Sequence, residues 1–522
     1  MALTYQQIFV ASFVGAFLIY AIRSASARKR MNGAKPPPGP KGWPVVGNAP
    51  ELASSDGNLI PIFRKWAKTY GDIVQFSILG EKHVVLSSDK IAHELFVKRG
   101  SKYSDRGTPY AMKYVTRDLN PALMPKNEAW RRERKFLHSA VSITANDKYL
   151  KLMEEEARIT LRDLVQDPGD FDNHMKRYSF GVLTRSMLGF RVGSADHPFI
   201  TDTNNFIDET MKCFRPDEHP TNVLPFLRSF PTWLVPSLGT LERLRKQDYD
   251  NMWSLRRQIE ASVKGGTAEP SIYRHFIENR GEYDIGDDEA GYAFGSMIGG
   301  GTRSPHNGLL TFLYLMMEYP EWQEKLQKQI DEVVGPGRLP CFADIPKLPV
   351  VRAVVKEGIR YRSIMAELGL PHRLEQDDTY NGYFFQKDTV FHANYAAILM
   401  DKDNYPDQLP FNPARWLDPS YPTYKEPLTV HPNCQNFTPF GYGRRACPGY
   451  DFAERTLVIL VAQIAWACDI KGPVDPETNK PIAVEIEYEP VPNPKPFPFP
   501  CVIKPRSTER SKLVKLEAEK CA

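Results

Sequence analysis

The chain has 522 residues and a nearly balanced formal charge of +4, and its length allows several domains or one large core. The balanced charge argues against a bulk polyanion partner such as nucleic acid. The seven cysteines form no C-x-x-C pair, which argues against a zinc framework or a disulfide scaffold and favours a reducing compartment.

The N-terminus predicts a membrane anchor. Residues 8–22 (IFVASFVGAFLIYAI) carry no charge, and extension of this segment at both ends reaches the length of a bilayer-spanning helix. A cleaved signal peptide is the alternative, but such peptides carry positive charge before the apolar core, whereas the basic residues here follow it. The positive-inside rule then leaves the rest of the chain in the cytosol. We expect a transmembrane signal anchor at 1–27 and a stiff, basic and proline-rich hinge at 28–50.

Short elements follow the hinge. Apolar residues at helical spacing predict a helix at 59–70, and the patterns at 72–79 and 82–86 predict two strands, with clear alternation in the first. Another helix is expected at 89–100, where a glycine ends it. Residues 149–263 are mostly helical in pattern and are interrupted by prolines.

Trp130 and Arg134 lie four residues apart, so they share one face of a helix. The neighbouring basic residues face elsewhere and are candidates for a surface that docks an acidic partner protein. Further along, residues 289–317 are long enough for about eight helical turns. Pro305 lies inside this long helix, where it must kink the helix or free a carbonyl group. An amphipathic helix at 319–334 follows.

Glu357 and Arg360 form an E-x-x-R pair, one helical turn apart. By itself this pair is uninformative, because such charges usually lie on a solvated face. Arg415 follows in a P-x-R segment. Arg373 precedes two short β runs at 383–385 and 389–393.

The stretch at 437–450 reads FTPFGYGRRACPGY and carries an F-x-x-G-x-R-x-C-x-G pattern, made by Phe440, Gly443, Arg445, Cys447 and Gly449. A cysteine that ligates iron must be a thiolate, which is best held where backbone N–H groups at a helix N-terminus point at the sulfur. Arg445 offers a fork for a carboxylate. Phe440 can shield the sulfur from water and tune its potential.

This stretch resembles the haem-binding signature of the haem-thiolate monooxygenases, the cytochrome P450 family. The resemblance implies that Cys447 is the axial thiolate of the iron in haem b and that Arg445 meets a haem propionate. It also implies a mainly α fold with a small β-rich lobe and a long central helix over the haem. The catalytic domain is then expected at 51–510, with a charged tail at 511–522. Microsomal members carry a similar proline hinge.

The resemblance extends along the chain, because five family segments occur in family order. It implies that Trp130, Arg134 and Arg373 contact the haem propionates. It further implies that Glu357, Arg360 and Arg415 form a buried charge network that holds the cysteine loop, since buried charges survive only when they are paired. The proline-rich segment at 485–499 is expected to turn into the active site, where Val491, Pro492 and Phe497 are candidates for substrate contact.

The central helix departs from the family pattern A/G-G-x-D/E-T-T, whose acid and alcohol help deliver protons. Arg303 stands at the acid, Ser304 at the first threonine and Pro305 at the second. An arginine cannot donate and recover a proton near neutral pH. Either Thr302, Ser304, His306 or an ordered water supplies the proton path, or Arg303 points away and pairs with a carboxylate. Both readings stay open at this point, so Arg303, Ser304 and Thr302 are the candidate catalytic residues.

The resemblance implies a monooxygenase that oxidises a C–H bond of a hydrophobic small molecule with dioxygen. Electrons are expected from an NADPH-dependent flavoprotein reductase, with cytochrome b5 as a further candidate partner. The sequence of the cysteine loop is similar to that of fungal members that modify polyketides, alkaloids or terpenoids. The expected location is the endoplasmic reticulum membrane, with a single span and a cytosolic catalytic domain. The alternatives are an oxidative rearrangement, ring expansion, desaturation or coupling without net oxygen insertion, and a haem-binding protein without turnover.

Overall fold

The computed structural model describes residues 31, 33–55, 58–363, 369–478, 480, 482–488 and 495–521. The anchor predicted at 1–27 lies outside these residues. Within the described ranges, no helix has both the length and the apolar character that crossing a bilayer requires.

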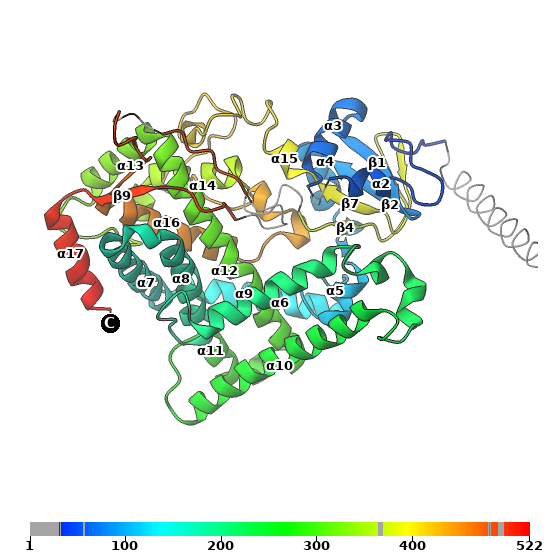
Figure 1. The fold of residues 1–522 in the computed structure, drawn as a ribbon, viewed down its shortest axis with the longest axis horizontal. Coiled ribbons are helices and arrows are strands. Elements are labelled where there is room, and N and C mark those ends of the chain that lie inside the picture. The colour runs from blue at the N-terminus through cyan, green and yellow to red at the C-terminus, as the bar shows by residue number, and fades with distance from the viewer. Residues whose placement is uncertain are drawn as a thin grey trace, which may run out of the picture.

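The chain folds into a helical body and a smaller lobe that contains most of the strands (Figure 1). The α-helices are α2 (Ala49–Ala53), α3 (Ile60–Tyr70), α4 (Asp89–His93), α5 (Tyr110–Val115), α6 (Glu128–Ile143), α7 (Asp147–Gln166), α8 (Phe171–Leu183), α9 (Pro198–Met211), α10 (Pro236–Lys264), α11 (Ile272–Glu278), α12 (Asp287–Glu318), α13 (Pro320–Val333), α14 (Pro349–Tyr361), α15 (Tyr395–Ile398), α16 (Tyr450–Ala467) and α17 (Thr508–Glu519). The strands are β1 (Ile73–Ile78), β2 (Glu81–Leu86), β3 (Asp105–Arg106), β4 (His372–Arg373), β5 (Asp378–Tyr380), β6 (Tyr383–Phe385), β7 (Val390–Ala393), β8 (Cys468–Lys471) and β9 (Val502–Pro505).

Helix α12 runs through the middle of the helical body and packs against α8, α14 and α16 (Figure 1). Its second half is buried on nearly every side from Leu309 to Met317. Helix α16 is buried almost throughout from Thr456 to Ala467. A helix that is apolar all round belongs in the interior, so these two helices form the centre of the core. Pro305 lies within α12 and does not end it.

The main sheet has the strand order β1-β2-β7-β4-β3. Strand β2 pairs antiparallel with β1 and parallel with β7, which comes about three hundred residues later in the chain. Strand β4 lies between β7 and β3, and its register places His372 opposite Arg106. This pairing brings two distant parts of the chain to one edge of the candidate site.

Helix α17 crosses the boundary that the sequence suggested at residue 510. Val514 and Ala518 are buried, and Arg510 pairs with Asp331 of α13 at 2.7 Å. The C-terminal helix therefore packs against α13 and buries part of its surface.

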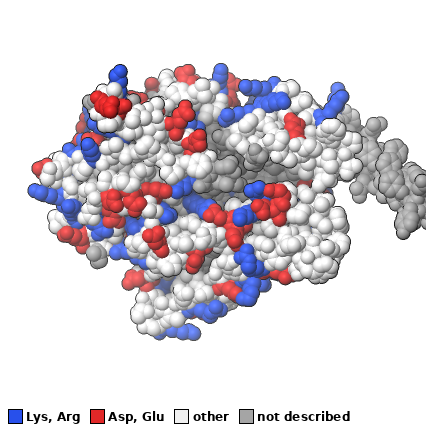
Figure 2. All heavy atoms as spheres, in the orientation of Figure 1, with Lys and Arg blue, Asp and Glu red and all other residues white. Residues whose placement is uncertain are grey.

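The surface carries no large region of a single charge on the face drawn in Figure 2, where acidic and basic side chains are interspersed. This distribution agrees with the balanced composition of the chain.

Candidate active site

The cysteine loop is held by tight backbone turns between two short 3-10 turns and the start of α16. Gly441 has φ of 86° and Gly443 has φ of 53°, a backbone region that suits glycine. A Cβ atom on Gly443 would overlap the carbonyl oxygen of Phe96. The N–H of Cys447 donates to the carbonyl of Phe440 at 2.6 Å, which closes the loop. Gly443 is thus required by close approach and by backbone conformation, and Gly441 by backbone conformation alone.

The Cys447 side chain is exposed, yet the surrounding protein is dense enough that desolvation raises its thiol pKa. The thiol therefore lies at the bottom of a recess rather than on an open surface. The backbone N–H of Gly449 and the guanidinium of Arg134 both act to lower the same pKa. These two groups favour the thiolate, which is the form that ligates a metal.

Three arginines gather beside this recess. Arg445 is buried and donates to the carbonyls of Ser104 (2.7 Å), Pro121 (3.2 Å) and Met124 (2.8 Å), while Arg134 donates to the carbonyl of Ala446.

Arg106 is the third member, and it donates to the carbonyl of Leu370 at 2.7 Å. Burial, followed by repulsion from Arg106, lowers the pKa of Arg445 to about 8. Burial also lowers the pKa of Arg106 to about 10. In the part of the chain that the structure describes, none of Arg106, Arg134 and Arg445 has a carboxylate within ion-pair distance.

This cluster fits a group that carries carboxylates. Trp130 lies under Arg445, with the guanidinium carbon 4.3 Å from the ring centroid. The indole N–H of Trp130 is buried and has no acceptor among the described residues. A buried donor without an acceptor is costly, and so is a buried charge without a counter-charge. Haem propionates would supply both, so the residues present suit haem.

Arg373 does not join this cluster. Its guanidinium pairs with Asp388 at 3.4 Å. Successive residues of a strand point to opposite faces, and it is the neighbouring His372 that points inward. His372 is buried, its Nδ1–H donates to the carbonyl of Tyr103 at 2.7 Å, and its ring stacks on Phe96. Burial and the nearby Arg106 hold the pKa of His372 well below its usual value, so the imidazole is neutral.

The predicted charge network is assembled around Glu357. Its carboxylate accepts from Arg360 (Nε 2.9 Å and Nη2 2.8 Å) and from Arg415 (Nε 2.9 Å), and all three side chains are buried. Trp416 Nε1 donates to the same carboxylate at 3.0 Å, and the backbone N–H of Asn412 donates at 3.1 Å. The remaining guanidinium N–H groups donate to backbone carbonyls, so the two buried arginines share one carboxylate and their other donors also have acceptors.

Aromatic contacts connect this network to the cysteine loop. The rings of Trp416 and Phe437 lie 5.5 Å apart, and Phe437 begins the loop. Lys356 Nζ lies 4.4 Å from the Trp416 ring centroid and 5.0 Å from that of Phe437. Burial lowers the pKa of Lys356 to about 8. The network thus holds the first residue of the loop through packing as well as through charge.

Arg303 points away from the interior and toward α9. Its Nη2 lies 2.6 Å from Asp208 Oδ1, and its Nε donates to Asn204 Oδ1 at 3.3 Å. The geometry therefore matches the alternative in which Arg303 pairs with a carboxylate. Asp208 is more than half exposed, so this ion pair contributes only modestly to the contact between α12 and α9.

The other polar residues in this part of α12 face different neighbours. Thr302 is fully buried, and its hydroxyl donates to the carbonyl of Ile298 at 3.0 Å. His306 Nε2 lies 2.7 Å from Asp172 of α8, and Asp172 also pairs with Lys495 at 2.6 Å. Ser304 lies on the remaining face of the helix, the side that carries Gly308 and Thr311.

Several site residues had no recognisable signal in the sequence. Arg106 lies in a two-residue strand, and Trp416 and Asp208 reach their partners only through tertiary packing. His372 adjoins Arg373 in the Pro-His-Arg run, so strand alternation was the one signal available. Of the predicted substrate contacts, Val491 and Pro492 lie outside the described residues, and Phe497 is 45% exposed.

The fold and the cysteine site together define a haem-thiolate enzyme class, and comparison with known proteins agrees. The Cytochrome P450 family model matches residues 37–485. Cytochrome P450 monooxygenase psoD of Aspergillus fumigatus is 55% identical over 482 residues, which cover 92% of this chain and 93% of that protein. Cytochrome P450 monooxygenase virE of Hypocrea virens is 32% identical, with coverage of 93% and 88%.

A solved structure of a zebra fish cytochrome P450 with Abiraterone has a TM-score of 0.65 at 20% identity, and the match covers 86% of this chain and 99% of that one. This chain belongs to the cytochrome P450 family, and it is a haem-dependent monooxygenase similar to fungal members.

A charge reversal tests the role of Arg303. We expect Arg303→Asp to leave the coupling of NADPH to product unchanged and to weaken the contact between α12 and α9. Because Asp208 is exposed, the interaction energy between Arg303 and Asp208 should be about 0.2–1 kcal/mol. The measurement is a double-mutant cycle of unfolding free energies with Asp208→Arg, in which the double reversal restores stability. If Arg303→Asp instead greatly changed the coupling of NADPH to product and left the unfolding free energy unchanged, Arg303 would belong to the proton path.

Proposed function

We propose that the protein binds haem b through the Cys447 thiolate and oxidises a C–H bond of a hydrophobic small molecule with dioxygen. The observation that carries the proposal is the recessed thiol beside three arginines, of which Arg106 and Arg445 are buried, together with the indole N–H of Trp130, which has no acceptor among the described residues. A flat cofactor with an iron centre and two carboxylates complements each of these groups.

Different residues of the chain would stabilise the thiolate and bind the haem propionates. The Gly449 N–H and Arg134 favour the thiolate form of Cys447. Trp130, Arg106, Arg134 and Arg445 bind and orient the propionates through N–H donors. When bound, the haem supplies dioxygen activation, and a thiolate ligand favours O–O cleavage.

The proposal extends to electron supply and location. Electrons come from an NADPH-dependent flavoprotein reductase, with cytochrome b5 as a second donor. Residues 1–27 anchor the protein in the endoplasmic reticulum membrane by one span, and the catalytic domain is cytosolic. Support comes from the order of apolar and basic residues at the N-terminus and from the similarity to fungal monooxygenases.

The substrate class is proposed as a fungal secondary metabolite, namely a polyketide, an alkaloid or a terpenoid. Support comes from the fungal relatives and from the similarity of the cysteine loop to such members. The alternative of oxidative rearrangement without oxygen insertion depended on Arg303 replacing the relay acid. Its pairing with Asp208 supports the monooxygenase instead.

The test is expression of the full chain with a reductase, followed by feeding of candidate metabolites under heavy-isotope dioxygen. We expect a product whose mass shows one labelled oxygen atom. An altered product that carries no label would overturn the monooxygenase proposal and support the rearrangement.

A further inference from the structure

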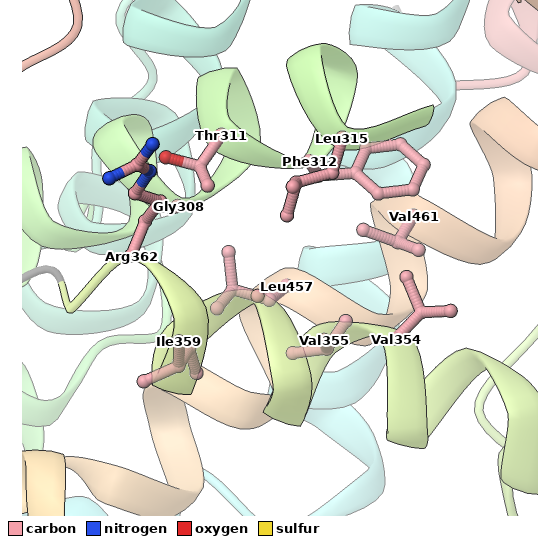
Figure 3. Close-up of a pocket in the computed structure, with 11 residues that line it drawn as sticks. Gly308, Thr311, Phe312, Leu315, Val354, Val355, Ile359, Arg362, Leu457 and Val461 are labelled. Carbon is pink, nitrogen blue, oxygen red and sulfur yellow. The ribbon is translucent and has the colours of Figure 1, made fainter. Parts of the chain in front are cut away.

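The two ends of the cysteine loop are held in different ways. The C-terminal end continues into α16, whose residues Leu457 and Val461 line a cavity of only about 20 Å³ against α12 and α14 (Figure 3). Side chains packed this closely leave a helix little freedom to shift. The N-terminal end, at 437–442, consists of short turns rather than of a long element. Its position therefore depends on contacts with other parts of the chain.

These contacts come from the segment that begins with α4. The carboxylate of Asp89, in the first turn of α4, accepts two hydrogen bonds at the same oxygen. The Thr438 hydroxyl donates at 3.0 Å and the Tyr442 hydroxyl donates at 2.6 Å. The ring centroid of Phe96, seven residues after Asp89, lies 5.9 Å from that of Tyr442. Thr438 and Tyr442 are both buried, so water competes little for the two hydrogen bonds.

The two hydrogen bonds act on the part of the loop that contacts the cysteine. Thr438 begins one 3-10 turn and Tyr442 immediately precedes the next, so one carboxylate oxygen fixes both turns relative to each other. Phe440 lies between them, and its carbonyl accepts the Cys447 N–H at 2.6 Å. The position of the backbone at Cys447 therefore depends on Asp89 through the Phe440 turn.

Asp89 also brings a negative charge to this end of the loop. Within the described ranges, no basic side chain lies within ion-pair distance of its carboxylate, so its charge is not neutralised locally. Burial, followed by the charge of Asp89, raises the pKa of Tyr442 well above its usual value, so the phenol keeps its proton and remains a donor. A nearby negative charge favours the more oxidised, more positively charged form of a metal ion.

We propose that Asp89 is a positioning residue for the haem thiolate: it fixes the turns of the cysteine loop through Thr438 and Tyr442, and its charge lowers the reduction potential of the haem iron. Groups outside the ligand shell commonly orient metal ligands and tune the metal in this way. Asp89 acts through the loop and through its charge, so it is not a catalytic residue. The inference rests on the proposed function, since the potential belongs to haem bound at Cys447.

Two sets of variants separate the position of the loop from the charge. Asp89→Asn removes the charge and keeps a carbonyl oxygen that accepts from both hydroxyls. The double variant Thr438→Val with Tyr442→Phe removes both donors and keeps the charge. Tyr103→Phe is the matched control, because Tyr103 is also a buried phenol and donates to another aspartate, Asp378, at 3.0 Å, outside the cysteine loop.

The measurements are the reduction potential of the haem iron in the purified full-length holoenzyme and the spectrum of its reduced carbon-monoxide complex. Asp89→Asn should shift the potential to a more positive value, with a several-fold rise in the equilibrium constant for reduction and with the thiolate signature retained. In the double variant, the share of the complex that lacks the thiolate signature should rise several-fold. Tyr103→Phe should match the wild type in both measurements.

A wild-type potential in Asp89→Asn would overturn the role of the charge, and a wild-type spectrum in the double variant would overturn the role in positioning. Tyr442→Phe alone keeps the hydrogen bond from Thr438, so it should show a smaller rise in the same spectral form and serves as the test if the double variant does not fold. Failure of the proposed function would instead appear in the wild type, as bound haem without a thiolate signature.

Discussion

Replacement of Cys447 by alanine is expected to abolish the thiolate signature in the spectrum of the reduced carbon-monoxide complex. The chain offers no other thiol in a comparable setting among the described residues, because the remaining cysteines are buried or half-buried outside the loop. Removal of the sulfur leaves the backbone turns of the loop intact, since these depend on Gly441 and Gly443. The loss should therefore be spectral and complete rather than a partial loss through unfolding.

The matched control is Cys341→Ala, because Cys341 is half-buried and interacts with Arg338 and Asp344 on another part of the protein. Its spectrum should equal that of the wild type. A Cys447→Ala protein with an unaltered spectrum would refute the assignment of Cys447 as the iron ligand.

Removal of the Glu357 carboxylate is expected to have the largest effect on stability. Glu357→Ala would leave the buried guanidinium groups of Arg360 and Arg415 without their counter-charge. Loss of one partner from a buried ion pair costs about 3–5 kcal/mol. Haem retention should fall together with stability, because the network packs against the start of the cysteine loop through Trp416.

The measurements are urea unfolding and haem content of the purified protein. Trp416→Phe is a milder variant that keeps a smaller aromatic ring at this buried position and removes the donor at 3.0 Å. A hydrogen bond to a charged group contributes about 1.5–3 kcal/mol, and the smaller ring adds a packing loss to this. Glu128→Ala is the control, since this carboxylate is exposed and pairs with Arg131. Wild-type stability and haem content in Glu357→Ala would contradict a structural role for the network.

The sequence predicts the site well where function requires fixed residues at fixed spacing. Cys447, Arg445 and Gly443 lie within one short loop, so local geometry alone relates them. The E-x-x-R pair is also local, and Arg415, which the family resemblance assigned to the same network, reaches Glu357 from fifty-five residues beyond Arg360. Helix α12 was expected at 289–317 and extends from Asp287 to Glu318, because a long apolar pattern specifies a buried helix.

The sequence does not predict a side chain's orientation or partner where two faces or two partners are possible. Arg373 and His372 are adjacent, and only the sheet register decides that the histidine points inward. Arg303 is paired with an aspartate ninety-five residues away, on a helix whose packing no local pattern describes. Such outcomes depend on tertiary contacts, and one sequence without relatives does not specify these contacts.

The clustering of Arg106, Arg134 and Arg445 makes the stability of the protein in a cell depend on its cofactor. These like charges repel one another, so the propionates of a bound haem would act as their counter-ions and would add to the stability of the folded chain. A ligand present at a hundredfold excess over its Kd adds about 2.7 kcal/mol to the stability of the native state. Chains without haem form the less stable fraction, which proteases remove first. The abundance of this protein should therefore follow the haem supply of the cell as closely as it follows transcription of its own gene.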